Sequence, residues 1–209
     1  MSRASSRPPS PSTFRTFEEI RARRRGPGLT AEDWADAALW SLVDGVDALS
    51  VERLAGKLGV TKGSFYWHFK GRPALVRAAL ERWEQLATQD VITRLDALPT
   101  PEARLRQLLV VTFEPEPAGR IEVAIAAAAA NPLIQPVLAR VSRRRIDYLV
   151  SLYRAMGMPL RDARAWALQA YSTYVGLLHL SIASPDTLRS ARERSDYVKH
   201  LARALMPST

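Results

Sequence analysis

The chain has 209 residues, a formal net charge of +9 and no cysteine, and 47% of its residues are hydrophobic. This length supports one large domain or two small ones, each with its own core. The lack of cysteine excludes disulfides and thiolate chemistry, and no uninterrupted apolar run reaches the roughly 18 residues of a membrane helix. Because no apolar stretch follows Arg3 and Arg7, we expect no signal peptide and a cytoplasmic protein.

The N-terminal segment, residues 1–26, is rich in proline, serine and arginine and has no apolar periodicity. We therefore expect a disordered basic arm. Residues 1–25 hold seven arginines and two glutamates, a net charge of +5. Arg21, Arg23, Arg24 and Arg25 are candidates for insertion into a minor groove of DNA; a tail that adds only non-specific affinity is the alternative.

Capping residues and glycines divide the next part of the chain into three predicted helices. Each begins at a Ser or Thr that can cap it, and the first also has Asp33 in a capping-box position. Apolar residues recur within the first two at helical spacing. The predicted starts and ends are Thr30 and Gly45, Ser50 and Gly59, and Thr61 and Phe69.

A long helix follows, with Pro73 in its first turn and its end near Leu98. Prolines, glycine and asparagine separate the remaining predicted helices. They are expected at about 102–113, 119–130, 133–156, 160–183 and 190–206. No strand alternation is present, so the predicted fold class is all-α, with a domain boundary inside the long helix near residue 86.

Two short helices joined by a tight glycine turn, after a supporting helix, predict a helix-turn-helix unit over residues 50–69. The second helix of such a unit enters the major groove, where polar side chains at its N-terminus reach base edges. Flanking helices contact phosphates. Between Ser50 and Ala78, six basic side chains oppose only Glu52, which fits a phosphate-facing surface; a solvated charged face is the ordinary explanation for a charge run alone.

This segment resembles a known domain. The matching residues are Ala37-Ala38-Leu39, Gly45, Leu54-Ala55 and the run Leu58-Gly59-Val60-Thr61-Lys62-Gly63-Ser64-Phe65-Tyr66-Trp67-His68-Phe69-Lys70. Together they resemble the DNA-binding domain of TetR-family regulators over about residues 27–87. At 88–209 the resemblance is to the family's architecture only. It implies a C-terminal helical bundle for ligand binding and dimerisation.

The resemblance implies a role for each matching residue. Lys62, Gly63 and Ser64 correspond to positions that approach base edges, and Tyr66 corresponds to a phosphate contact. The full predicted DNA-binding set is Ser50, Arg53, Thr61, Lys62, Gly63, Ser64, Tyr66, Trp67, His68, Lys70 and Arg72.

Three neighbouring residues carry open or different expectations. The apolar Phe65 and Phe69 are four residues apart, so we expect them to share a buried face. Trp67 either packs or reaches the groove. Glu52 is undecided, because an acid near DNA repels phosphate unless it accepts from cytosine N4 or points away.

A dimer is also implied, because two recognition helices must face two half-sites. The resemblance places its interface on the helices at about 160–183 and 190–206. Small residues would allow close helix approach there, although packing within the chain would use them equally well. These are Ala163, Ala167, Ala170 and Gly176.

The resemblance further implies that the C-terminal bundle binds a small, partly apolar effector, and that this binding alters the spacing of the recognition helices. The candidate pocket residues are Phe113, Tyr148, Tyr153, Trp166, Tyr171, Tyr174 and His179. The run Ala126–Ala130 either packs a helix tightly or leaves space for this ligand. One of Arg143, Arg144 and Arg145 would suit an acidic ligand, but we expect a solvated face.

An enzyme is disfavoured, and no catalytic residue, metal or cofactor is expected. His68, His179 and His200 lack metal-ligand spacing, and Gly59–Ser64 has Lys-Gly-Ser where a phosphate loop has Gly-Lys-Ser, with no strand before it. The sequence thus predicts a sequence-specific DNA-binding transcriptional regulator, a repressor released from its operator by a small molecule. A non-enzymatic helical adaptor is the alternative.

Overall fold

The computed structural model describes residues 14–23, 28–113, 118–188 and 190–207, and this part of the chain is helical with no strand. The first elements are α1 (Phe17–Arg23), α2 (Ala31–Leu42), the short η1 (Val46–Ala48), α3 (Val51–Leu58), α4 (Lys62–Tyr66), α5 (Arg72–Glu84), η2 (Gln85–Gln89) and α6 (Asp90–Asp96). They are followed by α7 (Pro101–Phe113), α8 (Ala118–Ala127), α9 (Gln135–Ala155), α10 (Leu160–Ala183), η3 (Pro185–Leu188) and α11 (Ala191–Ala204). The predicted all-α fold class is therefore confirmed.

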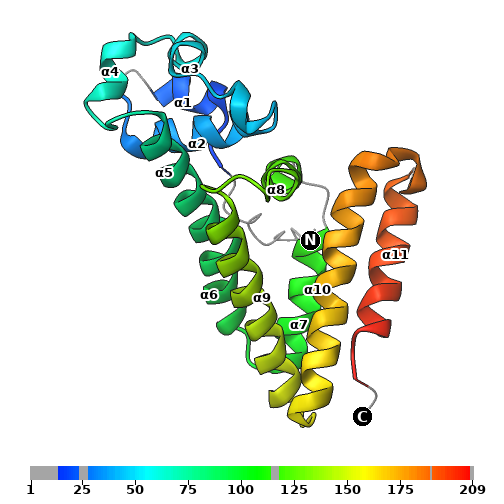
Figure 1. Ribbon diagram of the computed structural model, residues 1–209. Helices are drawn as coiled ribbons and strands as arrows, with labels where there is room; N and C mark the ends of the chain where they lie inside the picture. Colours follow the sequence, from blue (N-terminus) through cyan, green and yellow to red (C-terminus); the bar gives the residue numbers. More distant parts are fainter. Residues whose placement is uncertain (1–13, 24–27, 114–117, 189, 208–209) are drawn as a thin grey trace, which may run out of the picture.

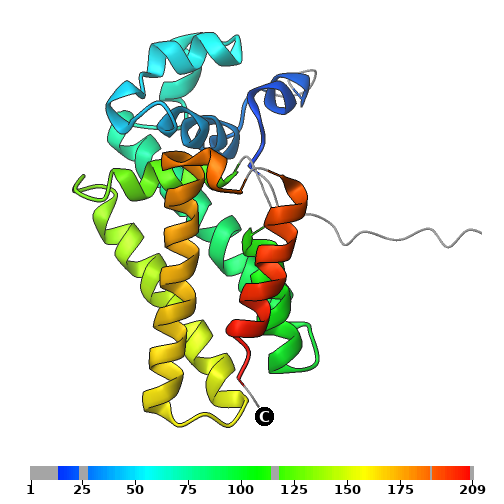
Figure 2. The same cartoon turned by 90° about the vertical axis from the view of Figure 1, so that its right-hand side faces the viewer.

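Helices α1 to α4 form one end of the molecule, and the long helices α9, α10 and α11 extend away from it, with α8 between the two parts (Figure 1). Figure 2 shows the same arrangement from the side, with α9 and α10 running as an antiparallel pair. None of the described helices is long and apolar enough to cross a membrane.

Most predicted helix starts occur where the caps indicate. Thr30 and Asp33 form a complete capping box at the start of α2, and the Ser50 hydroxyl accepts from the Arg53 amide at the start of α3. Thr61 precedes α4, but its side chain makes no capping bond. Helix α4 is also shorter than predicted, because the chain turns after Tyr66.

The expectation of disorder over residues 1–26 is wrong for residues 14–23, while residues 1–13 and 24–27 lie outside the described part. Phe14 and Ile20 are buried in the core, and α1 packs on α3. Arg15 donates to carboxylates of Glu32, Asp33 and Asp36 on α2, at 2.7–3.1 Å. The segment folds because these acids neutralise its charge and two apolar side chains are enough to anchor it.

The long helix predicted from Pro73 to Leu98 is interrupted by a π-helical turn, η2, at Gln85–Gln89. Such turns insert a residue into an α-helix and leave a backbone carbonyl without its usual partner, and they occur often at functional sites. Here the carbonyl of Ala87 accepts from Arg145 of α9 at 3.1 Å. The interruption therefore has a tertiary partner that periodicity does not reveal.

Two apolar cores hold the helices together. The first combines α1 to α5 with Ile121 and Ile125 of α8 and Ile134 and Val141 at the start of α9. The second joins α7, α9, α10 and α11, and in it Ala163, Ala167 and Ala170 are buried against their own chain. The small residues named as candidate dimer contacts thus serve internal packing, except for the exposed Gly176.

Candidate functional site

The helix-turn-helix geometry follows from one glycine and two phenylalanines. Gly59 ends α3 with φ of 69°, a left-handed conformation that favours glycine, and so turns the chain directly into α4. Phe65 is fully buried, with its ring stacked on Phe69 at 5.5 Å and edge-on to Trp34 at the same centroid distance. The expectation that both phenylalanines are core residues is confirmed. This anchor holds the opposite face of α4 toward solvent.

The predicted DNA-contacting residues on α3, on α4 and after α4 are exposed or partly exposed. Tyr66 is 57% exposed and Trp67 is 88% exposed, so the tryptophan does not pack in the core. Ser50 and Ser64 are partly exposed. The other exposed members of the predicted set are Arg53, Thr61, Lys62, Gly63, His68 and Lys70.

Arg72 differs from its predicted role. Its guanidinium donates to the carbonyl of Leu49 at 3.0 Å and to the carbonyl of Val46. It therefore holds the loop before α3 against the start of α5, and its predicted contact with DNA has no support from this placement.

Glu52, left undecided by the sequence, forms an exposed ion pair with Lys62 and accepts from the Ser50 hydroxyl at 3.1 Å. The hydrogen bond from Lys62 lowers the pKa of Glu52 to about 2, and the same bond raises the pKa of Lys62. Both groups are fully ionised at neutral pH. Lys62, which is predicted to approach base edges, is thus held by an acid on the neighbouring helix.

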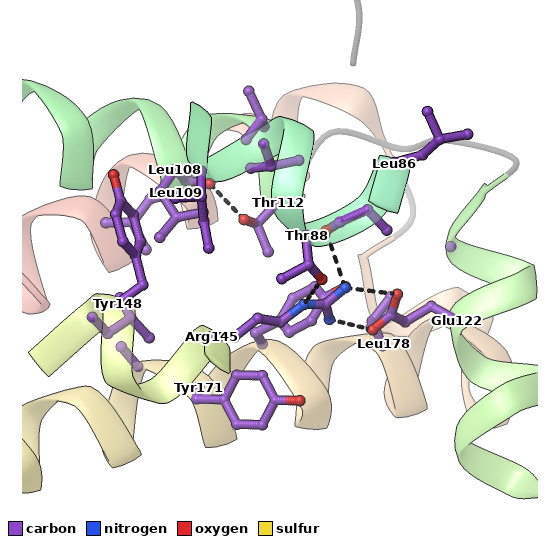
Figure 3. A pocket seen from close by; sticks show the side chains of 18 of the residues that line it. Leu86, Thr88, Leu108, Leu109, Thr112, Glu122, Arg145, Tyr148, Tyr171 and Leu178 are labelled. Atoms are coloured by element: carbon purple, nitrogen blue, oxygen red, sulfur yellow. Dashed lines mark hydrogen bonds and ion pairs between the residues drawn. The ribbon is translucent and has the colours of Figure 1, made fainter. Parts of the chain in front are cut away.

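A second site is a cavity of about 180 Å³ in the C-terminal half. Its wall comes from the end of α5 and from η2, α6, α7, α8, α9 and α10, and Phe14 from the N-terminal segment completes it. Most of the lining is apolar, and Figure 3 shows Tyr148, Tyr171, Thr112 and Thr88 around the open space.

The charged groups at this cavity are Arg145 and Glu122, which sequence reasoning missed as a pair. Arg145 donates to both carboxylate oxygens of Glu122, to Thr88 Oγ1 at 3.0 Å and to Ala87 O (Figure 3). Trp83 Nε1 donates to Glu122 Oε2 at 3.0 Å. Burial disfavours the charged form of the Arg145 guanidinium. The attraction of the Glu122 carboxylate outweighs this effect of burial, so the pKa of Arg145 is raised.

The expected solvated arginine face is correct for Arg143 and Arg144, which are exposed, and wrong for Arg145, which points inward. Glu122 could have been found from its context, because it is the only acid in α8, whose other residues apart from Arg120 are small or apolar. Arg145 could not have been identified in this way. The rotation of α9 decides which of the three consecutive arginines points inward, and this rotation is set by packing.

The predicted pocket residues divide into two groups. Tyr148, Tyr171 and Tyr174 line the cavity. Trp166 and Tyr153 pack on each other in the second core, with ring centroids 5.8 Å apart, and His179 is exposed. The side chain of Phe113 lies outside the described part, and Ala126–Ala130 is at the end of α8, away from the cavity lining.

Fold and sites together define an all-helical, two-part protein with an exposed helix-turn-helix unit and a cavity in a separate bundle. Among the described residues, no group of His, Asp or Glu side chains could hold a metal ion. Residues 36–79 match the family model described as bacterial regulatory proteins, tetR family. This match covers the helix-turn-helix unit and agrees with its predicted resemblance to the TetR-family DNA-binding domain.

Individual known proteins are similar to this chain in part of the sequence or in fold. The HTH-type transcriptional regulator TtgW of Pseudomonas putida, described as uncharacterized, is 33% identical over 88 residues, which cover 33% of this chain and 63% of that protein. The chain therefore matches less than two thirds of that relative's length.

Solved structures share the fold across most of the chain. Escherichia coli NemR in its reduced form has a TM-score of 0.69 at 18% identity, covering 86% of this chain and 98% of that one. A transcriptional regulator from Rhodococcus sp. Rha1 has a TM-score of 0.66 at 20% identity, with 84% and 93% coverage. A Saccharomonospora viridis protein in complex with choline has a TM-score of 0.64 at 16% identity, with 83% and 93% coverage.

Proposed function

We propose that this protein is a sequence-specific DNA-binding transcriptional regulator of the bacterial cytoplasm that acts as a homodimer and leaves its operator when a small molecule binds. The observation that carries the proposal is the exposed polar surface of α4, held outward by the buried Phe65 and Phe69 in a TetR-type domain. Lys62, Gly63 and Ser64 read bases in this proposal, while Tyr66 and Lys70 contact phosphates.

An apolar stripe on α10 supports the dimer. Leu160, Leu168 and Val175 are spaced by eight and seven residues, which places them on one helix face, and they are 47%, 56% and 42% exposed. The exposed Gly176 lies beside them. A Leu168→Glu variant should be monomeric in sedimentation and bind operator DNA poorly, whereas Val110→Glu on α7, exposed outside this stripe, should remain dimeric.

The structure offers a route between cavity and DNA-binding domain. Helix α8 presents Gly119 and Glu122 to the cavity, while its Ile121 and Ile125 pack in the core of the helix-turn-helix domain. A ligand that displaces α8 therefore acts directly on the packing of that domain.

A gel-shift experiment with the DNA upstream of the protein's own gene tests the proposal. We expect binding that weakens steeply with salt, as counterion release requires. Lys62→Ala should relax sequence preference, whereas Tyr66→Phe should weaken binding evenly across sequences. Binding-site selection that recovers no preferred sequence would favour the helical adaptor instead.

A further inference from the structure

The Arg145–Glu122 pair leaves the cavity without an available charge. Arg145 donates hydrogen bonds to Thr88, to Ala87 O and to both oxygens of Glu122, and Glu122 also accepts from Trp83. An anionic ligand would have to take Arg145 from Glu122 and leave a buried carboxylate without its partner. Such an exchange is unfavourable, because an unpaired charge in a largely buried site loses its solvation without compensation.

A cationic ligand is disfavoured because its place is already taken by a cation of the chain. Carboxylate and aromatic faces together attract cations, and the cavity has both in Glu122, Trp83 and Tyr174. The chain already places its own cation there, with the Arg145 guanidinium 5.4 Å from the Trp83 ring centroid and 5.9 Å from that of Tyr174. A ligand ammonium would have to displace this guanidinium, which has no other acid among the residues lining the cavity.

The rest of the wall is apolar except for a few hydroxyl groups. Leu86, Leu108, Leu109 and Leu149 belong to its apolar part. Thr112 donates to Leu108 O at 2.5 Å, so its oxygen can still accept from a ligand hydroxyl. Tyr148 uses its hydroxyl on Asp96 at 3.0 Å and Tyr171 shares its own with Ser142 at 2.8 Å, which leaves their rings to face the cavity.

From this arrangement we infer that the effector is an uncharged, largely apolar small molecule with a hydroxyl or carbonyl group, and that carboxylates and ammonium compounds of the same shape are rejected. The inference rests on the proposed function, since it concerns the ligand of the same regulator. The resident ion pair is the selectivity device: it satisfies its own charges and offers none to the ligand.

Three probes of matched shape and different charge test this at pH 7: 4-ethylbenzyl alcohol, 4-ethylbenzoate and 4-ethylbenzylammonium. Calorimetric titration of the full chain should show saturable binding of the alcohol, and thermal denaturation should show that the alcohol raises the melting temperature. The affinity for each charged probe should be at least roughly tenfold weaker. Equal or tighter binding of either charged probe, or no binding of the alcohol, would overturn the inference. Val111→Phe, which fills the cavity from its wall, should abolish alcohol binding; unchanged binding would also overturn it.

Two variants should invert the selectivity. Glu122→Gln leaves Arg145 without its counter-ion and should make the benzoate the preferred probe, while Arg145→Gln leaves Glu122 and should favour the ammonium. Preference for the alcohol in both variants would contradict the role given to the ion pair. Circular dichroism checks the folding of both variants. If either variant is unfolded, the comparison of the three probes on the unaltered chain still tests the inferred ligand class.

The DNA experiment separates this inference from the proposed function. If the alcohol binds but does not release upstream DNA, the ligand class holds and effector-controlled release fails. If the benzoate or the ammonium releases DNA while the alcohol does not, effector control holds and the inferred ligand class is wrong.

Discussion

At the scale of single residues, the segment from Lys62 to Phe69 has a buried anchoring face and an exposed face. Phe65 and Phe69 are buried, while Lys62, three positions before Phe65, and Tyr66, the next residue after it, are exposed. Gly63 has no packing reason to be glycine: a Cβ built on it would meet only Thr61 Oγ1, at an ordinary 3.7 Å. Its small size fits the proposed close approach of the α4 backbone to DNA.

Gly63→Ala should leave the fold intact and weaken operator binding. Alanine favours the helix by up to about 1 kcal/mol, but the added methyl stands between the α4 backbone and the groove, so we expect a roughly tenfold or larger loss of affinity. Chemical denaturation and gel shift measure the two effects. Gly56→Ala in α3, also exposed with open space around it, is the matched control and should gain stability without this loss. Unchanged operator affinity in Gly63→Ala would show that the backbone keeps its distance from DNA.

Glu52→Gln tests the ion pair with Lys62. Because the pKa of Glu52 is lowered to about 2, the pair's contribution is present above the ordinary carboxylate pKa and is lost only as the pH falls toward 2, so it persists in any DNA-binding assay near neutrality. Removing the acid frees Lys62 and removes a charge that repels phosphate. We expect tighter binding and a salt dependence steeper by about one unit.

Asp44→Asn removes a different exposed acid of the same domain, paired with Lys57 at 3.6 Å, and should change operator affinity less. If Glu52→Gln instead weakens binding to one operator and not to others, Glu52 reads a cytosine directly.

At the scale of elements, the segment before α2 connects the two sites. Phe14 forms part of the cavity wall, and the next residue, Arg15, is held by three carboxylates of α2. Asp36 is fully buried and also binds Arg82 of α5 at 3.1 Å. The Trp40 indole donates to the Arg15 carbonyl at 3.1 Å. A ligand that touches Phe14 therefore touches a segment fixed to the DNA-binding domain.

Phe14→Ala should detach this segment and lower stability by up to roughly 3 kcal/mol, the lower end of the range for truncating a buried phenylalanine. Arg21 and Arg23 of α1 should then be cleaved faster by trypsin, which is measured by limited proteolysis. Phe17→Ala, a partly exposed neighbour in the same segment, should cost less. If trypsin cleaves Phe14→Ala and Phe17→Ala at the same rate, Phe14 does not hold the segment in place.

At the scale of the whole molecule, buried tyrosines make the folded chain sensitive to alkali. Burial raises the pKa of Tyr153 to about 12, and burial first, followed by a nearby acid, raises the pKa of Tyr148 and of Tyr174. Tyr153 lies in the second core, where its hydroxyl donates to Leu205 O at 2.8 Å. The other two line the cavity.

The contribution of these tyrosines to stability should be constant below pH 10 and fall between about pH 10 and 12. Below pH 10 these phenols are neutral in both states; above it they ionise in the unfolded chain first, which favours unfolding. For Tyr153 alone the loss is roughly 2 kcal/mol. Urea denaturation at pH 8, 10 and 11 measures it, and Tyr153→Phe should flatten the pH profile while lowering stability at pH 8, because the hydrogen bond is lost. An equally steep profile in that variant would assign the alkaline loss elsewhere.

The sequence by itself determined what is local. Capping boxes, glycine positions and 3.6-residue periodicity are properties of a few neighbouring residues, so the all-α class, the helix-turn-helix unit and the burial of Phe65 and Phe69 could be predicted. The exposed set around Lys62 followed from the same short motif.

Only the tertiary structure decided what depends on the packing of distant segments. The inward turn of Arg145, its pairing with Glu122, the place of Phe14 in the cavity wall and the bonding of Arg72 to its own domain each join residues more than twenty positions apart. A helical pattern gives each helix an apolar face but not the rotation and partner that packing selects. For that reason the exposed surface proposed to read DNA could be predicted from the sequence, and the charge-neutral cavity proposed to bind the effector could not.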